Sequence, residues 1–147
     1  MTAIAKKTFD ILLVEDNPAD VRLTLEALGE MPREKNLIVA KDGEEAIEYV
    51  KGTGIFSGSS KPDLILLDLN LPKKNGFEVL RELKTDPVLR RIPVVVLTTS
   101  NSERDILATF SLHANSYIQK PVEFGNFVDA MRSLRVYWFE TSSLPPK

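Results

Sequence analysis

The chain contains no cysteine and only one histidine, His113, among its 147 residues. Without thiolates it can form neither disulfides nor iron–sulfur clusters, and thiolate zinc sites are excluded. A single histidine also argues against the histidine-rich sites that bind zinc. A metal bound by this chain must therefore be held mainly by oxygen ligands, which hard divalent cations such as Mg²⁺ and Mn²⁺ prefer.

The chain also lacks a strong excess of charge of either sign and any long apolar run. Its 19 lysine and arginine residues nearly balance 21 aspartate and glutamate residues, which argues against an electrostatic nucleic-acid binder. Its longest apolar runs are too short to cross a bilayer, and residues 1–8 lack the apolar core of a signal peptide. We therefore expect a cytoplasmic protein with neither nucleic-acid nor membrane contacts.

Short apolar runs alternate with amphipathic segments along most of the chain. This alternation predicts an α/β fold with a doubly wound parallel sheet of five strands and five helices. The expected strands are residues 9–14, 37–40, 64–67, 93–97 and 116–119. The expected helices are Pro18 to about residues 29–32, residues 46–50, residues 76–85, Asn101 or Ser102 to Leu112, and residues 123–139. The apolar positions of the fourth helix are Ile106, Leu107, Phe110 and Leu112.

One domain over residues 9–139 is expected to follow a polar lead-in over residues 1–8. Residues 52–61 are rich in glycine and serine and predict a flexible loop inside this domain. Residues 140–147 are expected to form a loose C-terminal tail.

The run Leu64–Leu67 ends at Asp68 and is the centre of this pattern. Four consecutive apolar residues predict a strand buried on both faces. Asp68 then lies at its carboxyl end, where open α/β sheets bind their ligands. The run Ile11–Val14 has the same form and is followed by Glu15 and Asp16. If the two strands are neighbours, three carboxylates meet at one edge and require a cation.

Thr98 and Lys120 follow two further predicted strands at the same edge. A cation and an ammonium group that flank an anion indicate phosphoryl chemistry, in which an aspartate can be the nucleophile. Taken singly, each residue has a simpler interpretation: the acids as helix caps or turn residues, Thr98 as a strand-end hydroxyl, and Lys120 as a surface charge. Paired carboxylates can also perform general acid–base catalysis. The shared edge favours the phosphoryl site.

Four motifs together resemble the receiver domain of two-component response regulators over residues 9–139. They are Glu15-Asp16-Asn17, Asp68–Pro72 with Gly76, Leu97-Thr98-Thr99 and Tyr117–Pro121. The intervals of 30 residues from Asp68 to Thr98 and 22 from Thr98 to Lys120 also resemble that family. The resemblance implies a flavodoxin-like sheet of strand order 2-1-3-4-5, and an Asp68 that accepts a phosphoryl group from a histidine kinase.

The resemblance also implies roles for the surrounding residues. Mg²⁺ or Mn²⁺ would be held by Glu15, Asp16, Asp68 and the backbone carbonyl of Asn70. Thr98, Thr99 and Lys120 would contact the phosphoryl group, Thr98 and Tyr117 would form the switch, and Lys120–Pro121 would be a cis peptide.

Three positions depart from the family pattern. Thr99 is bulkier than the alanine or glycine of many receivers, which would slow water entry and the movement of Tyr117. Ser100 cannot position water as an acid or amide would, so we expect a long-lived phosphoryl state. His113 replaces a common glycine and could be either a relay histidine or, as we favour, a solvated loop residue.

The segment Val136–Phe139 is too apolar to face solvent entirely. Trp138 and Phe139 could belong to the core, or extend an apolar surface toward a partner, which we favour. The chain most resembles the small stand-alone cyanobacterial phytochrome response regulators. The segments that carry this resemblance are Leu69–Gly76, Arg91–Ser100 and Tyr137–Thr141 with Leu144-Pro145. That resemblance implies a phytochrome histidine kinase and a homodimer through the fourth helix, fifth strand and fifth helix, with Tyr117, Tyr137, Trp138 and Phe139 in the interface.

The residues after Phe139 are too few for a DNA-binding module, so we expect signalling through contacts with an unknown downstream protein. A phosphorelay intermediate is one alternative. A magnesium-dependent phosphohydrolase is another, although Asn70 stands where such enzymes have a second acid. A dimerisation module that works without phosphorylation is the third.

Overall fold

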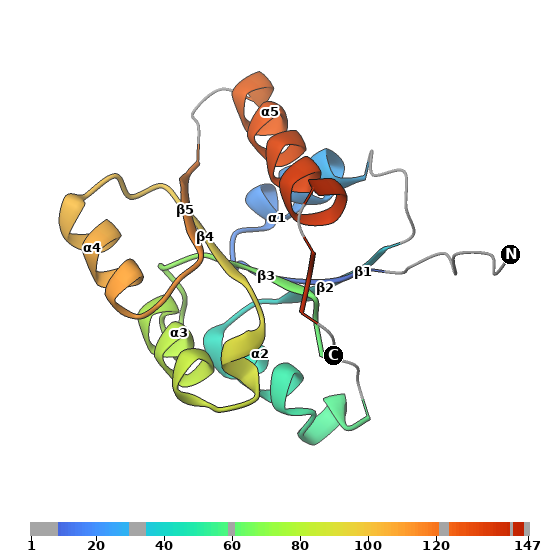
Figure 1. The fold of residues 1–147 in the computed structure, drawn as a ribbon, viewed down its shortest axis with the longest axis vertical. Coiled ribbons are helices and arrows are strands. Elements are labelled where there is room, and N and C mark those ends of the chain that lie inside the picture. Colours follow the sequence, from blue (N-terminus) through green and yellow to red (C-terminus); the bar gives the residue numbers. More distant parts are fainter. Residues whose placement is uncertain (1–8, 30–34, 59–60, 121–123, 142, 146–147) are drawn as a thin grey trace, which may run out of the picture.

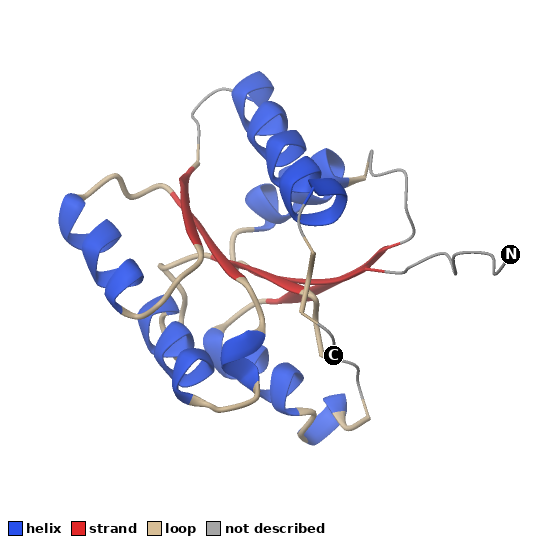
Figure 2. Ribbon diagram, viewed as in Figure 1, coloured by secondary structure: helices blue, strands red, loops and turns tan. Residues whose placement is uncertain are grey.

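The computed structural model describes residues 9–29, 35–58, 61–120, 124–141 and 143–145, and the predicted lead-in 1–8 lies outside them. Its strands form one parallel sheet in the order β2-β1-β3-β4-β5, which confirms the predicted fold (Figures 1 and 2). The strands are β1 (Phe9–Val14), β2 (Lys35–Ala40), β3 (Leu64–Leu67), β4 (Val94–Thr98) and β5 (Ser116–Gln119). The helices are α1 (Pro18–Leu28), α2 (Gly43–Lys51), α3 (Gly76–Thr85), α4 (Glu103–Ser111) and α5 (Phe124–Arg135).

Helices cover both faces of the sheet, which explains why β3 and β4 are buried at every residue. α1 and α5 lie on one face, and α2, α3 and α4 lie on the other (Figure 1). Each layer has its own apolar cluster, centred on Met131 and Leu28 in the first and on Leu80 and Val50 in the second. The sheet is therefore the common wall of two cores.

The strand register places the ends of β1 and β3 side by side. Val14 pairs with Leu67, and Leu67 pairs in turn with Val96 of β4. The residues that follow these strands therefore emerge together at the carboxyl edge, as in other open α/β sheets. Local signals start the helices beyond this edge: the Asn17 side chain caps α1, and Asn75 forms a capping box with Glu78 at α3.

Two apolar side chains of α4 face outward. Leu107 and Phe110, both among the apolar positions of this helix, are 68% and 47% exposed. The fully buried residue of this helix is Thr109, whose hydroxyl donates to the carbonyl of Ile106. Leu107 lies about half a turn from Thr109 and so points to the opposite side. A hydroxyl satisfied within its own helix can be buried, so apolarity alone does not identify the inward face of this helix.

The C-terminal segment also differs from the predicted helix over 123–139. α5 ends at Arg135, and Val136–Thr141 form a π-helical segment. Phe139 is buried there, with its ring centroid 4.4 Å from that of Phe9. This corrects the expectation that Phe139 faces a partner. Leu144 packs against the same cluster, so the tail is not loose throughout.

Phe139 is expected to be a stability residue. Phe139→Ala should lower the free energy of unfolding by about 3–5 kcal/mol, because it leaves a cavity beside Phe9. Tyr137→Ala is the matched control, since Tyr137 is 54% exposed and its loss should cost the monomer no more than about 0.5 kcal/mol. Urea unfolding of a dilute sample measures both. Equal destabilisation by the two variants would contradict the packing of Phe139.

Part of the predicted loop over residues 52–61 is ordered by packing. Gly54–Phe56 form a 3₁₀ turn, and the Phe56 ring stacks edge-on against Tyr49 at 5.3 Å between centroids. Lys61 closes the loop by donating to the carbonyl of Val50 at 2.8 Å. Within the described ranges, no helix is both long enough and apolar enough to span a membrane.

Candidate functional site

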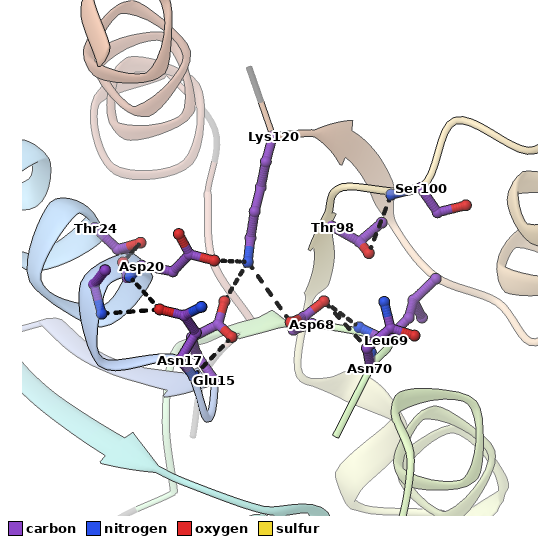
Figure 3. A network of polar contacts seen from close by, with 11 residues as sticks. Glu15, Asn17, Asp20, Thr24, Asp68, Leu69, Asn70, Thr98, Ser100 and Lys120 are labelled. Atoms are coloured by element: carbon purple, nitrogen blue, oxygen red, sulfur yellow. Dashed lines mark hydrogen bonds and ion pairs between the residues drawn. The ribbon is translucent and has the colours of Figure 1, made fainter. Parts of the chain in front are cut away.

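Polar side chains from four strand ends converge at the carboxyl edge of the sheet (Figure 3). Glu15 follows β1, Asp68 follows β3, Thr98 ends β4 and Lys120 follows β5. All four are buried, although each is polar. Burial of polar side chains is costly unless they are paired, and the pairs that they form here define the site.

Lys120 is the centre of the charge network. Its ammonium nitrogen Nζ forms a close ion pair with Glu15 Oε1, lies 2.9 Å from Asp20 Oδ2, and lies 3.6 Å from Asp68 Oδ2. Burial by itself would lower the pKa of Lys120, but the carboxylates of Glu15, Asp20 and Asp68 outweigh it and raise that pKa. The ammonium group is therefore held charged and can neutralise an anion at Asp68.

The second feature is an acidic cluster. Glu15, Asp16 and Asp68 each offer a carboxylate oxygen, and these oxygens all lie within 4.8 Å of one another. Asp16 is exposed, whereas the other two are buried. Burial, together with the nearby Asp68, raises the pKa of Glu15 to about 7 against the opposing effect of Lys120. The cluster has the oxygen chemistry that Mg²⁺ and Mn²⁺ require.

Backbone groups orient the carboxylate of Asp68. Its Oδ1 accepts hydrogen bonds from the amides of Leu69 at 2.7 Å and Asn70 at 3.4 Å. Its Oδ2 is the oxygen nearer Lys120 (Figure 3). The backbone amide of Asp68 donates to the carbonyl of Val14 at 3.1 Å, which ties the carboxylate to the end of β1.

The loop after β4 connects the site to β5. The amide of Ser100 lies 3.5 Å from Thr98 Oγ1, and its hydroxyl donates to Asp105 Oδ2 at 2.6 Å. The half-buried Tyr117 donates its hydroxyl to the carbonyl of Ser100 at 2.8 Å. Hydrogen bonds at Ser100 therefore connect Thr98 to Tyr117. Thr99 is exposed on this loop.

Two other predicted positions lie apart from this network. His113 is exposed in the turn before β5, with a left-handed φ of 69°, a conformation that explains why glycine is common at such a position. Pro121 lies outside the described residues, and so does the predicted cis peptide that joins it to Lys120.

Sequence reasoning missed two polar groups. Asp20, in the first turn of α1, reaches Lys120; the available signal was an acid in the first turn of the helix that begins just after Glu15 and Asp16. Lys84 donates to the carbonyls of Arg90 and Ile92 and to Asn115 Oδ1. Burial lowers the pKa of Lys84 to about 8. No local pattern revealed Lys84, because its partners lie on other elements.

A doubly wound sheet whose carboxyl edge carries three acids, a threonine and a lysine defines a class of phosphoacceptor signalling domains. Residues 11–132 match the family model for the response regulator receiver domain, and the chain belongs to that family.

The response regulator Rcp1 of Synechocystis sp. is 46% identical over 92% of each chain. The crystal structure of the phosphorylated cyanobacterial phytochrome response regulator RcpA superposes with a TM-score of 0.93, at 46% identity over 95% of this chain and all of that one. The Mn²⁺-bound form of Rcp1 superposes with a TM-score of 0.90, at 45% identity over 94% of this chain and 99% of that one.

Proposed function

We propose that this receiver protein accepts a phosphoryl group on Asp68 from a phytochrome-type histidine kinase in the cytoplasm, and signals by changing its protein contacts. The observation that carries the proposal is the placement of Asp68, with one carboxylate oxygen 3.6 Å from the Lys120 ammonium and the acids Glu15 and Asp16 beside it. The kinase assignment is supported by the similarity to RcpA and Rcp1.

The transfer needs no general base. A carboxylate oxygen of Asp68 forms a bond to phosphorus while the bond from phosphorus to the donor's histidine nitrogen breaks, so Asp68 loses no proton. Lys120 neutralises charge on the phosphoryl oxygens, and the Thr98 hydroxyl donates to one of them. The site for Mg²⁺ or Mn²⁺ would consist of Glu15, Asp16, Asp68 and the Asn70 carbonyl. A bound cation would supply further charge neutralisation.

Metal affinity is expected to depend on pH through Glu15. A pKa of about 7 means that Glu15 holds a proton below that pH, and this proton must leave before the carboxylate can serve a cation. The dissociation constant for Mg²⁺ should therefore rise as pH falls below 7, by up to about tenfold per unit. Titration calorimetry at several pH values measures this. Glu15→Gln should bind more weakly but with a flatter profile, and an unchanged slope would contradict the role of Glu15.

The switch is proposed to run from Thr98 to Tyr117. Phosphorylation adds a charge of about −1.5 to −2 at Asp68, and the Thr98 hydroxyl would move to hydrogen-bond it. The backbone at Ser100 accepts from Tyr117 and donates toward Thr98, so this movement would change the position of Tyr117 on the face formed by α4, β5 and α5.

The phosphoryl state is expected to be long-lived, because Ser100 offers no acid or amide to orient water and its hydroxyl is already directed at Asp105. Ser100→Glu should shorten the half-life of the phosphoryl group by about threefold or more, by positioning a water molecule. Loss of labelled phosphate over time measures this. Ser111→Glu, on an exposed position of α4, is the control. A half-life that is the same in the wild type and in Ser100→Glu would contradict the prediction.

A homodimer through α4, β5 and α5 is part of the proposal. Leu107 and Phe110 on α4 and Tyr137 after α5 are exposed apolar side chains. The half-buried Tyr117 and Trp138 line one surface hollow together with Tyr137. Association would remove such side chains from water. Sedimentation with and without beryllofluoride, a mimic of the aspartyl phosphate, tests it. A concentration-independent monomer under both conditions would exclude the dimer.

Phosphotransfer from purified kinases tests the proposed function. Labelled phosphate should pass to the wild-type chain from a phytochrome histidine kinase faster than from an unrelated histidine kinase. Equal transfer from both would remove the phytochrome assignment and keep the receiver chemistry. No transfer from either, combined with no uptake from a small phosphoryl donor, would overturn the proposed function.

A further inference from the structure

Asp20 gives Lys120 a partner outside the acidic cluster at the strand ends. Its Oδ2 lies 2.9 Å from Lys120 Nζ, closer than the 3.6 Å from that nitrogen to Asp68 Oδ2. Figure 3 shows the Lys120 side chain between the two acids, with Asp20 and Glu15 on the side of α1 and Asp68 on the other. In this geometry the ammonium group is displaced toward α1, away from the proposed phosphoacceptor.

The position of Asp20 is set by its own helix. Its backbone amide donates to the capping side chain of Asn17 at 3.2 Å, and its carbonyl accepts from the Thr24 hydroxyl at 2.8 Å. The Asp20 side chain is 31% exposed, and partly exposed ion pairs contribute little to stability. Maintenance of the fold is therefore a weak reason for this contact, whereas its effect on Lys120 is direct.

An ammonium group has three hydrogen-bond donors and no acceptor. Among the residues that the structure describes, its ionic contacts are the ion pair with Glu15, the 2.9 Å contact with Asp20 and the longer approach to Asp68. A phosphoryl group on Asp68 would bring new anionic oxygens that need at least one of these donors. Glu15 is fully buried beside the lysine, so the partly exposed Asp20, which water can solvate, is the partner more easily released.

We propose that Asp20 is a positioning residue that competes with the phosphoryl group for Lys120 and thereby sets how readily Asp68 is phosphorylated. Asp20 holds the ammonium group on the α1 side in the unmodified protein and releases it when the phosphoryl group arrives. The inference rests on the proposed function, because it takes Asp68 as the acceptor.

The test compares Asp20→Asn with the wild type. Beryllofluoride binding is measured at saturating Mg²⁺, and the Mg²⁺ dissociation constant is measured separately, so that a change in metal affinity is not mistaken for the effect. Asp20→Asn should bind beryllofluoride about two- to fivefold more tightly, the range that one partly exposed ion pair supports. Its phosphorylation by phosphoramidate should accelerate correspondingly. Glu26→Gln removes one charge from an exposed position of the same helix and should behave as the wild type.

Equal or weaker beryllofluoride binding by Asp20→Asn, with the wild type binding normally, would overturn the role of Asp20 and leave the proposed function standing. Tighter binding by both Asp20→Asn and Glu26→Gln would also overturn it, since the effect would then follow net charge and not the contact with Lys120. A wild-type protein that neither binds beryllofluoride nor accepts a phosphoryl group would refute the proposed function and this inference together. Urea unfolding of all three proteins identifies a variant that has lost its fold.

Discussion

Asp68→Asn is expected to abolish phosphoryl uptake, whether the donor is a histidine kinase or phosphoramidate. An amide cannot form the acyl phosphate, and the other acids of the site, Glu15 and Asp16, are placed to bind a cation beside Asp68. The fold should persist, because an asparagine oxygen can still accept from the amides of Leu69 and Asn70. Label incorporation, followed by intact-mass measurement, gives the result.

Asp129→Asn is the matched control for this experiment. Asp129 is exposed on α5, and its only described ion pair is with Arg132 on the same helix. Its replacement should leave uptake unchanged. Retained uptake in Asp68→Asn, with label recovered on another residue, would show that the acceptor has been assigned wrongly.

Gly76→Ala is expected to damage both stability and phosphoryl uptake. A Cβ atom at Gly76 would lie 2.3 Å from the Asp68 carbonyl oxygen and 2.6 Å from the Leu69 Cα. Both neighbours are backbone atoms, so the chain at the phosphoacceptor must move. Overpacking of this kind costs about 1–3 kcal/mol or more. The displacement should also move the Asp68 carboxylate away from Lys120, and slow uptake by about tenfold or more.

Gly125→Ala separates this clash from the general effect of replacing glycine in a helix. A Cβ at Gly125 meets no atom within 4 Å, and alanine in a helix is favoured over glycine by up to about 1 kcal/mol. This control should therefore be neutral or slightly stabilising, with normal uptake. Urea unfolding and phosphoramidate labelling measure both properties. If Gly76→Ala matched the control in both measurements, the close approach at Asp68 would be refuted.

The local pattern was sufficient where one feature dominated the energetics. Leu64–Leu67 must be buried on both faces because four consecutive side chains are apolar, and this requires helices on both sides of the sheet. Glu15 and Asp68 were expected at one edge on the condition that their strands are neighbours, and β1 and β3 do pair. Asn75 and Glu78 likewise form the capping box that begins α3.

The local sequence pattern was insufficient where a side chain could face either inward or outward at similar local energy. Leu107 and Phe110 are apolar, yet they face outward because Thr109 can satisfy its hydroxyl within α4 and occupy the inward position. Phe139 could serve a partner or the core, and the choice depends on Phe9, which is distant in sequence and adjacent in space. Whether such a side chain is buried depends on which helix and strand surfaces pack together in the folded chain.

The sequence by itself therefore determined the alternation of strands and helices and the acids at the strand ends, because apolar runs and strand-end residues act through short-range chemistry. Its motifs indicated the family, and the strand order was expected from that resemblance. Only the tertiary structure decided that Asp20 reaches Lys120 and that Phe139 closes the core over Phe9. These contacts join residues about 100 or more positions apart, so they depend on how α1, α5 and the sheet pack together and leave no local periodicity to detect.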